Sequence, residues 1–320
     1  MDTMKAIRIH EYGGPEVLRY EEAPIPEVRA EDVLVQVQAA GVNPVDWKIR
    51  QGYLTQRLQY ELPVTLGWDV AGVVARVGSE VSGVNVGDAV YGRPDISRNG
   101  AYAEFISVRA QEVAPRPRML DPIGAAAVPL ACLTAWQALF EAVAPYSSAH
   151  LERGQTILIH GAAGGVGTFA VQLAKWRGAR VIATGSARNG EFLHALGADV
   201  FVDYNVRPFE KVVSGVDVVL DTVGGDTQNR SWQILRPNGV LVSIVAPPSL
   251  EAARQRGCRA AYVFVQPNRR QLEEITGLID SRRLRPILAE SFRLREARRA
   301  HELSQAGHVR GKIVLIPHEG

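Results

Sequence analysis

The sequence predicts an α/β protein with two domains, one β-rich and one built on a doubly wound parallel sheet. Its 320 residues are many for a single hydrophobic core, which favours two domains. Short strands broken by turns fill roughly the first 120 residues, whereas strand-sized and helix-sized runs alternate from about Ile123 onward. We therefore expect residues 1–122 and 266–320 to form the β-rich domain and residues 123–265 to form the parallel-sheet domain.

Alternating apolar residues predict the strands of the first part. Residues 32–41 read "DVLVQVQAAG", with apolar side chains at every second position, as in a strand with one buried face. Further short strands are expected, between turns rich in Gly, Pro, Asn and Ser, in "DVAGVVARVG" (69–78), "DAVYG" (88–92) and "AYAEFISV" (101–108). Short strands at this spacing indicate a small, strongly bent barrel.

The second part opens with a helical stretch of small residues, "AAAVPLACLTAWQALFEAV" (125–143). Strand-sized runs rich in Val and Ile then alternate with helix-sized runs, the pattern of a parallel sheet covered on both faces. These runs are "QTILIHG", "VGTFAVQLAKWRG", "RVIATG", "EFLHALG", "ADVFVDY", "VDVVLDTVGG", the helix-sized "NRSWQILRPNG" (229–239), and "VLVSIV". A final stretch, from residue 267 to residue 317, has the pattern helix, strand, helix, strand.

Composition argues against several classes of partner. The formal net charge of +2 gives no reason to expect nucleic acid or an anionic membrane surface. No apolar run approaches the ~20 residues that span a bilayer, and the N-terminus has no signal-peptide core. The two cysteines, Cys132 and Cys258, suit a reducing compartment and exclude a Cys-rich structural zinc site. We expect a cytoplasmic protein, with Met1 or Met4 as its native start.

The strongest chemical signal is the segment "TILIHGAAGGVGTFAVQLAKWRG" (156–178). A buried-type strand is followed by glycines three residues apart and then by an amphipathic helix, which Gly178 is placed to cap. A pyrophosphate needs a tight turn, backbone N–H groups that no Cβ blocks, and a helix N-terminus. We expect it to be held by Gly161, Ala163, Gly164, Gly165, Val166 and Gly167. The alternative is a glycine-rich turn without a ligand.

The residues after the next predicted strand favour NADP(H) over NAD(H). An NAD site usually places Asp or Glu about 20 residues beyond the glycines, to hold the ribose 2′-hydroxyl. Here "RVIATG" runs into Ser186, Ala187, Arg188 and Asn189, so a hydroxyl and a guanidinium stand where a 2′-phosphate would lie. Arg188 alone is equally consistent with an exposed residue at a helix start; the absence of an acid carries the prediction.

Several stretches together resemble the medium-chain dehydrogenase/reductase superfamily. They are "AAGVNPVDWKIRQG" (39–52), "LGWDVAGVVARVG" (66–78), "VGDAVYG" (86–92), "PLACLTAWQAL" (129–139), "HGAAGGVGTFAVQLAK" (160–175) and "GKIVL" (311–315). The similarity covers nearly the whole chain and is greatest to the zinc-free quinone oxidoreductase branch, which is zeta-crystallin-like. The resemblance implies a GroES-like catalytic domain, a Rossmann domain inserted into it, and an NADPH-dependent quinone or enone reductase.

The chain departs from the zinc-dependent members of that superfamily. Where those enzymes place zinc ligands, this chain has Asn43, Trp68 and Leu130, none of which binds zinc. Cys132 lies two residues beyond the third position and is interpreted as a small apolar residue on a helix face. Surface or capping roles are expected for the histidines, which lack ligand spacing: His10, His150, His160, His194, His301, His308 and His318. We expect no metal.

Loss of the metal changes the chemistry that is available. Zinc polarises a carbonyl or acidifies an alcohol, so alcohol oxidation becomes difficult without it. Hydride delivery to a quinone or an activated alkene stays feasible, because the negative charge spreads onto an oxygen that hydrogen-bond donors can hold. The resemblance and the missing zinc ligands therefore point to the same reaction.

Candidate catalytic residues lie in "NPVDWKIRQGY" (43–53). Asn43 is expected to face the nicotinamide ribose or the substrate carbonyl, or else to be only a turn residue before a proline. Tyr53 and Lys48 are candidate donors to the substrate oxygen, with a packed loop aromatic and a solvated lysine as the alternatives. Asp46 is interpreted as a hydrogen-bonding residue at a helix start. Trp47 is placed with Trp68 in the substrate pocket.

Further cofactor contacts follow from the resemblance or from strand ends. Thr134 matches a threonine beside the nicotinamide, and Tyr204 is expected next to the adenosine 2′-phosphate. Val223 and Gly224 end a predicted strand, where ligands of parallel sheets bind. The resemblance also implies that one segment lines the nicotinamide, and its predicted contact residues are Phe264, Val265 and Asn268.

In "GWDVAG" (67–72), the indole of Trp68 is predicted to fill the space of the absent metal and to form an apolar wall for a flat substrate. Asp69 is then a structural partner for nearby backbone or for a cation.

The strand "AAYVFV" (260–265) is expected at an edge of the parallel sheet and predicts a homodimer joined there. Two rival functions stay open: an NADPH-binding protein with a structural, sensing or RNA-binding role, and an alcohol dehydrogenase-like enzyme.

Overall fold

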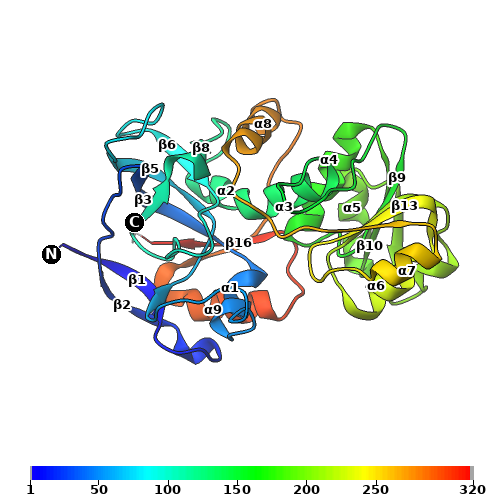
Figure 1. Cartoon of the computed structure of the whole chain (residues 1–320), viewed down its shortest axis with the longest axis horizontal. Helices are drawn as coiled ribbons and strands as arrows, with labels where there is room; N and C mark the ends of the chain where they lie inside the picture. The colour runs from blue at the N-terminus through cyan, green and yellow to red at the C-terminus, as the bar shows by residue number, and fades with distance from the viewer. Residues whose placement is uncertain (1, 318–320) are drawn as a thin grey trace. The chain divides into compact units, whose positions relative to one another are not determined.

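The computed structural model describes residues 2–317, and these residues form two compact units (Figure 1). The first unit takes its described residues from Met1–Leu130, Pro267–Arg282 and Pro286–Gly320. The second unit consists of Ala131–Gln266 and Arg283–Arg285. It begins later than the predicted boundary at residue 123, because helix α2 (Pro122–Ala126) packs on strands of the first unit.

The first unit is GroES-like and contains two sheets. One has seven strands in the order β15-β16-β3-β5-β6-β8, with β7 paired to β3, and the other has the order β2-β1-β4. The strands are β1 Thr3–Ile9, β2 Arg19–Pro24, β3 Asp32–Val42, β4 Val64–Thr65, β5 Val70–Val77, β6 Ala89–Gly92, β7 Phe105–Arg109, β8 Val113–Pro115, β15 Leu288–Arg293 and β16 Lys312–Ile316.

Strand β3 organises the larger sheet because it pairs with three other strands. Its alternate residues Val33, Val35 and Val37 are fully buried, as the alternation predicts. Leu34 and Ala40, on its opposite face, are buried as well. The register shifts twice between β3 and β5, and such irregularities increase the local twist and bend.

The C-terminal stretch follows the predicted order helix, strand, helix, strand. Strand β16 runs antiparallel to β3, with Val314 opposite Gly41, so the last strand of the chain lies beside one of the first (Figure 1). The helices of this unit are α1 Pro44–Arg50, α2 Pro122–Ala126, α8 Arg269–Asp280 and α9 Ala297–Gln305, with 3-10 turns η1 Pro15–Val17, η2 Ala110–Glu112 and η5 Leu294–Glu296.

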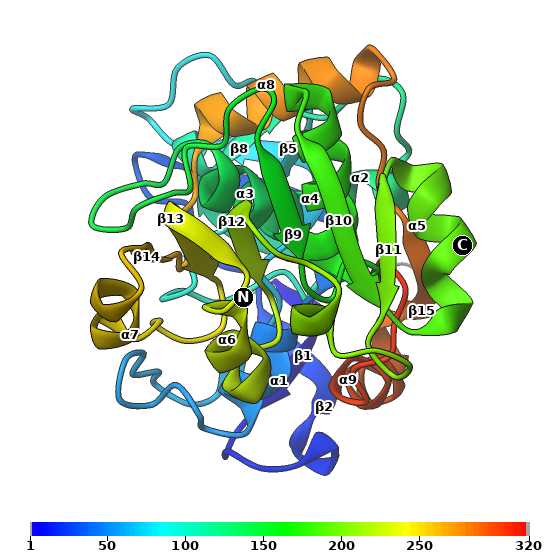
Figure 2. The same ribbon diagram turned by 90° about the vertical axis from the view of Figure 1, so that its right-hand side faces the viewer.

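The second unit contains a six-stranded parallel sheet of Rossmann type, in the order β11-β10-β9-β12-β13-β14 (Figure 2). The strands are β9 Thr156–Ile159, β10 Arg180–Gly185, β11 Val200–Asp203, β12 Val216–Asp221, β13 Leu235–Ser243 and β14 Arg259–Tyr262. The chain order reverses between β9 and β12, and ligands of such sheets bind at the carboxyl ends of the strands near that point.

Helices cover this sheet: α4 packs on β9 and β10, α5 on β11, α6 on β12 and β13, and α7 on β14. These helices are α4 Gly165–Arg177, α5 Gly190–Leu196, α6 Gly225–Ser231 and α7 Leu250–Gln255, with 3-10 turns η3 Ala187–Asn189 and η4 Phe209–Lys211. A further helix, α3 Pro129–Leu139, precedes them in the chain. Gly178 ends α4 in a left-handed conformation, with φ of 87°, which confirms the predicted cap.

Two predicted helical stretches differ from the structure. Residues 125–143 form parts of two helices, since α3 starts anew at Pro129, whose ring cannot continue the preceding helix. Residues 229–239 are mostly not helical, because α6 ends at Ser231 and β13 already begins at Leu235. Val216 pairs with Leu235 before the register shifts, so the strand reaches back into the expected helix.

Two histidines do not have the expected surface or capping role. His160 and His301 are buried, and burial lowers the pKa of the first to about 4 and of the second to about 3. His160 lies within hydrogen-bond distance of Thr184 Oγ1 (3.2 Å) and Ser231 Oγ (2.9 Å), and His301 Nδ1 lies 3.1 Å from Arg50. Exposed positions are confirmed for His10, His150, His194 and His308. His318 lies outside the described residues.

Candidate active site

The glycine-rich turn joins β9 to the N-terminus of α4 in the second unit. The peptide N–H groups of the first turn of α4 have no acceptor within the helix, so they are available to an anion. Gly164 is the N-cap residue, and the helix begins at Gly165 and continues through Val166. The strand, turn and helix that a pyrophosphate needs therefore occur at the predicted residues.

Two of the glycines are required for different reasons. Gly161 has φ of 58°, and a Cβ there would lie 2.5 Å from Thr222 Oγ1. A Cβ on Gly167 would collide with the carbonyl oxygen of Gly161 and with Ala162. The first glycine therefore allows the turn, and the last allows the helix to approach the strand closely, as in a dinucleotide cradle.

The carboxyl end of β10 carries the residues predicted for the 2′-phosphate. Ser186 and Arg188 follow β10 directly and lie in and around the turn η3. The backbone N–H of Tyr204 donates to Gly185 O over 3.3 Å, which places Tyr204 next to this strand end, and its side chain is 51% exposed. Ser186 Oγ accepts a hydrogen bond from Asn189, which leaves its own O–H free to donate.

Asp221 organises the turn after β12, and the sequence analysis did not single it out. Its buried carboxylate accepts N–H groups of Val223 (3.0 Å) and Gly224 (2.7 Å). The side chains of Gln228 and Ser243 donate to the other oxygen. The turn that carries both predicted contact residues is therefore held by one acid at a strand end, a position that the pattern "VVLD" could have marked.

A pair of glutamine contacts holds the last segment of the second unit against α3. Gln137 Nε2 donates to Gln266 O (2.8 Å), and Gln137 Oε1 accepts the N–H of Gln266 (3.0 Å). Thr134 lies one turn before Gln137 in α3, and Phe264 and Val265 precede Gln266 directly. The structure therefore brings these three predicted residues into one region, although Gln137 itself was not predicted.

Asn268 has a structural contact in the first unit. It is the N-cap of α8, and its side chain accepts the N–H of Gln271 over 3.0 Å. Its predicted contact with a cofactor stays a prediction.

The other predicted site is a buried polar cluster in the first unit, centred on Asp69. Asp69 accepts hydrogen bonds from Asn43 Nδ2 (2.8 Å), from the N–H of Leu130 (2.5 Å) and from Lys312 Nζ (3.0 Å). Lys312 also donates to Val42 O and to Asn43 Oδ1. Asp69 and Lys312 are almost entirely buried, so the pair is a buried ion pair.

This cluster includes two of the three positions at which the resemblance implies ligands in zinc-dependent relatives. The three positions that bear zinc ligands there are Asn43, Trp68 and Leu130 here: the first and last bind Asp69, and Trp68 precedes it. The prediction that Asp69 is a structural partner for nearby backbone or for a cation is confirmed, since it binds the N–H of Leu130 and the ammonium of Lys312. Among residues 2–317, no group of three or more His, Cys, Asp or Glu side chains is placed to hold a metal ion.

Asp46 has the structural role that its position predicts. Its carboxylate accepts the N–H of Asn43 (2.7 Å), as in a capping box, and the hydroxyl of Tyr102 (2.6 Å). Burial raises the pKa of Asp46 to about 7, and the bonds from Tyr102 and Asn43 offset only part of that effect. Its Oδ1 atom is buried without a hydrogen-bond partner.

The remaining predicted residues of the first unit lie on α1 and just after it. Tyr53 is 67% exposed, and its ring meets the indole of Trp47 edge-on at 6.2 Å. The ammonium group of Lys48 lies 5.7 Å from the centre of that indole, and burial lowers the pKa of Lys48. Trp68, by contrast, has no exposed surface, and its N–H donates to Arg98 O (3.2 Å). Its role as a substrate wall stays a prediction.

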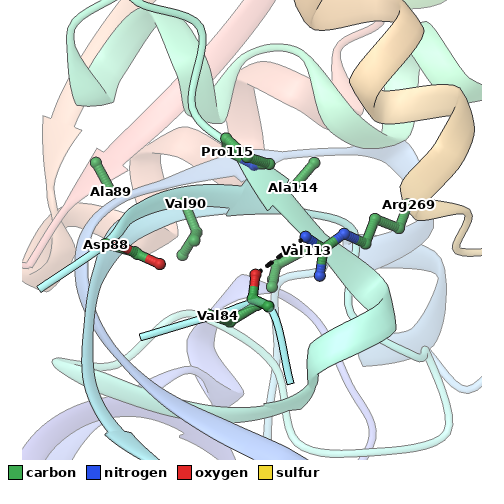
Figure 3. A pocket seen from close by; sticks show the side chains of 9 residues that line it. Val84, Asp88, Ala89, Val90, Val113, Ala114, Pro115 and Arg269 are labelled. Carbon is green, nitrogen blue, oxygen red and sulfur yellow. Dashed lines mark hydrogen bonds between the residues drawn. The ribbon is translucent and has the colours of Figure 1, made fainter. Parts of the chain in front are cut away.

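A separate pocket of about 190 Å³ lies between β6, β8 and the start of α8 (Figure 3). Its charged residues already have partners: Arg269 donates to Glu273 and to Gly83 O, and Asp88 accepts the N–H of Asn85. We assign no function to it.

Comparisons with known proteins agree with this architecture. Residues 29–118 match the family model of the alcohol dehydrogenase GroES-like domain, and residues 196–315 match that of zinc-binding dehydrogenase. The chain is 38% identical to the quinone oxidoreductase of Coxiella burnetii, whose structure aligns over 99% of this chain and 100% of that one with a TM-score of 0.91.

Two plant enzymes are also similar over 98% of this chain. The 2-methylene-furan-3-one reductase of Solanum lycopersicum is 33% identical, and 79% of its length is covered. The chloroplastic NADPH-dependent alkenal/one oxidoreductase of Arabidopsis thaliana is 32% identical, and 80% of its length is covered. Among the helices of residues 2–317, none has both the length and the apolar character that crossing a membrane demands.

The fold, the cradle and these relatives lead to one assignment. The chain belongs to the medium-chain dehydrogenase/reductase superfamily, in its branch of quinone oxidoreductase-like and enone reductase-like oxidoreductases.

Proposed function

We propose that this protein transfers hydride from NADPH to a quinone or to an α,β-unsaturated carbonyl compound. The cofactor class follows from the family, whose relatives include NAD(P)H-dependent enzymes. The observation that carries the proposal is the cradle of the second unit, where two glycines leave no room for a Cβ. These residues fit a dinucleotide pyrophosphate, because backbone N–H groups and a helix N-terminus are left open to an anion.

NADPH in preference to NADH is supported by the residues after β10. Ser186 and Arg188 offer a hydroxyl and a guanidinium, and Tyr204 adds an exposed ring and phenol beside the strand end. Arginine is suited to a phosphate because its planar fork donates two parallel hydrogen bonds. The acid that binds a ribose 2′-hydroxyl in NAD enzymes is missing at this place.

When bound, the dihydronicotinamide would supply a hydride, and the chain would supply orientation and charge. Thr134, Phe264 and Val265 are proposed to hold the nicotinamide end, and Val223 and Gly224 the segment between the ring and the cradle. The amide of Asn43 is held by Asp69 and Lys312, which leaves one N–H of Nδ2 for a ribose or substrate oxygen. Because these hydrogen bonds fix the amide of Asn43, we propose that Asn43 positions a ligand and does not transfer a proton.

The acceptor class is supported by the names of relatives and by the Asp69 cluster. The C. burnetii relative is named a quinone oxidoreductase, and the two plant relatives are named for the reduction of enones. At the three positions where the resemblance implies zinc ligands, this chain has Asn43, Trp68 and Leu130, and the first and last of them bind Asp69. Reduction of a conjugated carbonyl needs only hydrogen-bond donors for the oxygen that becomes negative.

The test is NADPH oxidation measured with a panel of quinones, alkenals and enones, run in parallel with NADH. We expect turnover with at least one conjugated acceptor, a lower KM for NADPH than for NADH, and little activity on simple alcohols with NADP⁺. An inert panel together with tight NADPH binding would instead support an NADPH-binding protein with a structural, sensing or RNA-binding role. Turnover confined to alcohols would support an alcohol dehydrogenase-like enzyme.

We also propose a homodimer joined through strand β14. This strand lies at one edge of the six-stranded sheet, where its outer N–H and C=O groups are open to a further strand. Pairing with the same strand of a second copy would satisfy them symmetrically. Sedimentation equilibrium should give the mass of a dimer; a monomer at every concentration would rule this out. A cytoplasmic location stays a prediction from composition.

A further inference from the structure

A buried arginine in the first unit has no hydrogen-bond or ion-pair partner in the described part of the chain. Arg93 follows the last residue of β6 and is only 1% exposed. Its Nε atom is buried without a hydrogen-bond partner, and within residues 2–317 its guanidinium forms no hydrogen bond or ion pair. Arginine is rarely buried unless it is paired, so this position calls for an explanation.

The two acids nearest to Arg93 in the partner segments form ion pairs with other cations. Gly92 pairs with Val70 on one side and with Val113 on the other, and both ladders end there. Asp69 and Glu112 are the next residues of the two partner segments, and their negative charges act on Arg93. Asp69 is bound to Lys312, and Glu112 is bound to Arg109 (2.9 Å). Glu112 shares Arg109 with Glu31 and Asp95, so both acids are bound to cations other than Arg93.

Arg93 keeps its charge at neutral pH. Burial lowers its pKa to about 10, and the negative charges of Asp95, Glu112 and Asp69 offset only part of that effect. An unpaired buried cation lowers stability, because its lost hydration is not replaced. Residues that reduce stability in this way commonly serve a ligand, since the cost is recovered when the ligand binds.

Arg93 also lies in the candidate active site of the first unit. Asp69, whose negative charge acts on Arg93, holds Asn43 through a hydrogen bond of 2.8 Å. Trp68 and Tyr60 are neighbours there, with ring centres 6.2 Å apart, and the phenol of Tyr60 contributes to the electrostatic surroundings of Arg93. An anionic oxygen on a flat conjugated substrate fits a guanidinium among aromatic rings.

We propose that Arg93 binds the substrate oxygen on which negative charge develops, and so selects conjugated carbonyl substrates. The proposal rests on the reductase function proposed above and names its oxyanion-binding residue. Hydride adds to the β-carbon of an enone, the C=C electron pair forms a new C=C bond between the α-carbon and the carbonyl carbon, and the C=O π pair moves onto oxygen. The guanidinium donates hydrogen bonds to this enolate without losing its proton. Water then protonates the α-carbon, the C=O bond forms again, and hydroxide is left.

The first experiment uses 4-nitrophenol as a probe of the oxyanion site, with NADP⁺ present. Its phenolate carries the charge of a flat conjugated oxyanion and has its own visible absorption band. At a pH below the pKa of the free phenol, wild-type protein should bind it as the phenolate. Arg93→Met should reduce that affinity at least ~10-fold, as loss of one charged hydrogen bond predicts, and Arg93→Lys should reduce it less. Exposed Arg76→Met is the control and should bind like wild type.

The second experiment measures thermal stability, which separates a ligand-binding arginine from a structural one. Arg98, in the same segment, is bound to buried Asp32 through two hydrogen bonds, so Arg98→Met should lower the Tm. Arg93→Met should leave the Tm unchanged or raise it by about 2–4 °C, because no partner is lost. A fall in Tm as large as that of Arg98→Met would show that Arg93 is structural and would overturn the proposal.

The third experiment keeps this inference distinct from the proposed function. With an acceptor that wild type reduces, Arg93→Met should lower kcat about 10²–10³-fold while NADPH affinity stays unchanged. If wild type reduces acceptors but Arg93→Met binds the phenolate equally well, the inference fails and the reductase function stands. If the acceptor panel is inert but phenolate binding needs Arg93, the oxyanion site stands and the reductase function fails.

Discussion

The two units build their candidate sites in opposite ways. The cradle of the second unit depends on side chains that are absent: Gly161 and Gly167 leave backbone N–H groups open within one continuous segment. The site of the first unit depends on charged side chains that are buried, and it joins Asn43, Asp69 and Lys312 from distant parts of the chain. A backbone site of this kind can be identified from a short stretch of sequence, whereas a buried charge network cannot.

The same contrast appears in how charge is balanced. In the second unit the partial charge of a helix N-terminus is left unbalanced, ready for a phosphate. In the first unit an internal ammonium, Lys312, satisfies one buried acid, and Arg93 is a cation whose Nε has no hydrogen-bond partner among the described residues. The first unit should therefore be more sensitive to removal of a charge, and the second to addition of a Cβ. The four predictions below test this difference, in order of expected effect.

The largest effect is expected from Lys312→Met, which leaves Asp69 as a buried acid without its cation. Removal of one member of a buried ion pair typically costs about 3–5 kcal/mol of unfolding free energy. Urea denaturation measures it, with Lys175→Met as the control, since the Lys175–Asp199 pair is partly exposed on both sides and should contribute at most about 1 kcal/mol. Adding Asp69→Asn to Lys312→Met should recover part of the loss. Equal losses for both lysine variants would contradict the prediction.

The next effect is expected from Gly167→Ala in the cradle. The new Cβ meets the carbonyl oxygen of Gly161, so the helix must move away from the strand and the phosphate groove opens. We expect NADPH affinity to fall by at least ~10²-fold, which is about 2.7 kcal/mol, by fluorescence titration. Gly277→Ala, on α8 with open space around it, is the matched control and should leave the affinity intact. Unchanged NADPH binding by Gly167→Ala would show that the cradle is not the cofactor site.

A smaller effect is expected on cofactor choice. Arg188→Glu replaces a guanidinium by the acid that NAD enzymes use for the ribose 2′-hydroxyl, and it repels a 2′-phosphate. The ratio of kcat/KM for NADPH to that for NADH should fall about 10-fold or more, or about 1.4 kcal/mol. Arg180→Ser, at the amino end of the same strand, is the control and should keep the wild-type ratio. A ratio that does not move in Arg188→Glu would place the 2′-phosphate elsewhere.

The smallest effect is a pH dependence in the first unit. The pKa of Asp46 is raised to about 7 in the folded protein, so the folded state binds a proton that the unfolded state has lost. This term lowers stability as pH rises from about 4 to about 7 and is constant above that. Asp46→Asn should flatten that part of the urea-unfolding profile, while Tyr102 and the N–H of Asn43 keep an acceptor. The same slope in both proteins would show that Asp46 is ionised throughout this range.

Prediction from sequence succeeded where the structure is local. The strand, glycine turn and helix of residues 156–178, and the cap at Gly178, follow from spacing alone. It failed where neighbours in space decide, as for His160, whose burial depends on Thr184 and Ser231 from other elements. Pro129 divides one expected helix into two, an effect that the proline itself could have predicted.

The sequence by itself predicted the fold class and the cradle, because each depends on residue types at short spacing, and its resemblance to a known superfamily predicted that zinc ligands are missing. Tertiary structure alone decided which groups join around Asp69. Lys312 reaches Asp69 only because β16 pairs with β3, and Arg93 is left unpaired only because both neighbouring acids already have cations. Such charge balance is set by strand pairing over long sequence separations, which a single sequence does not display.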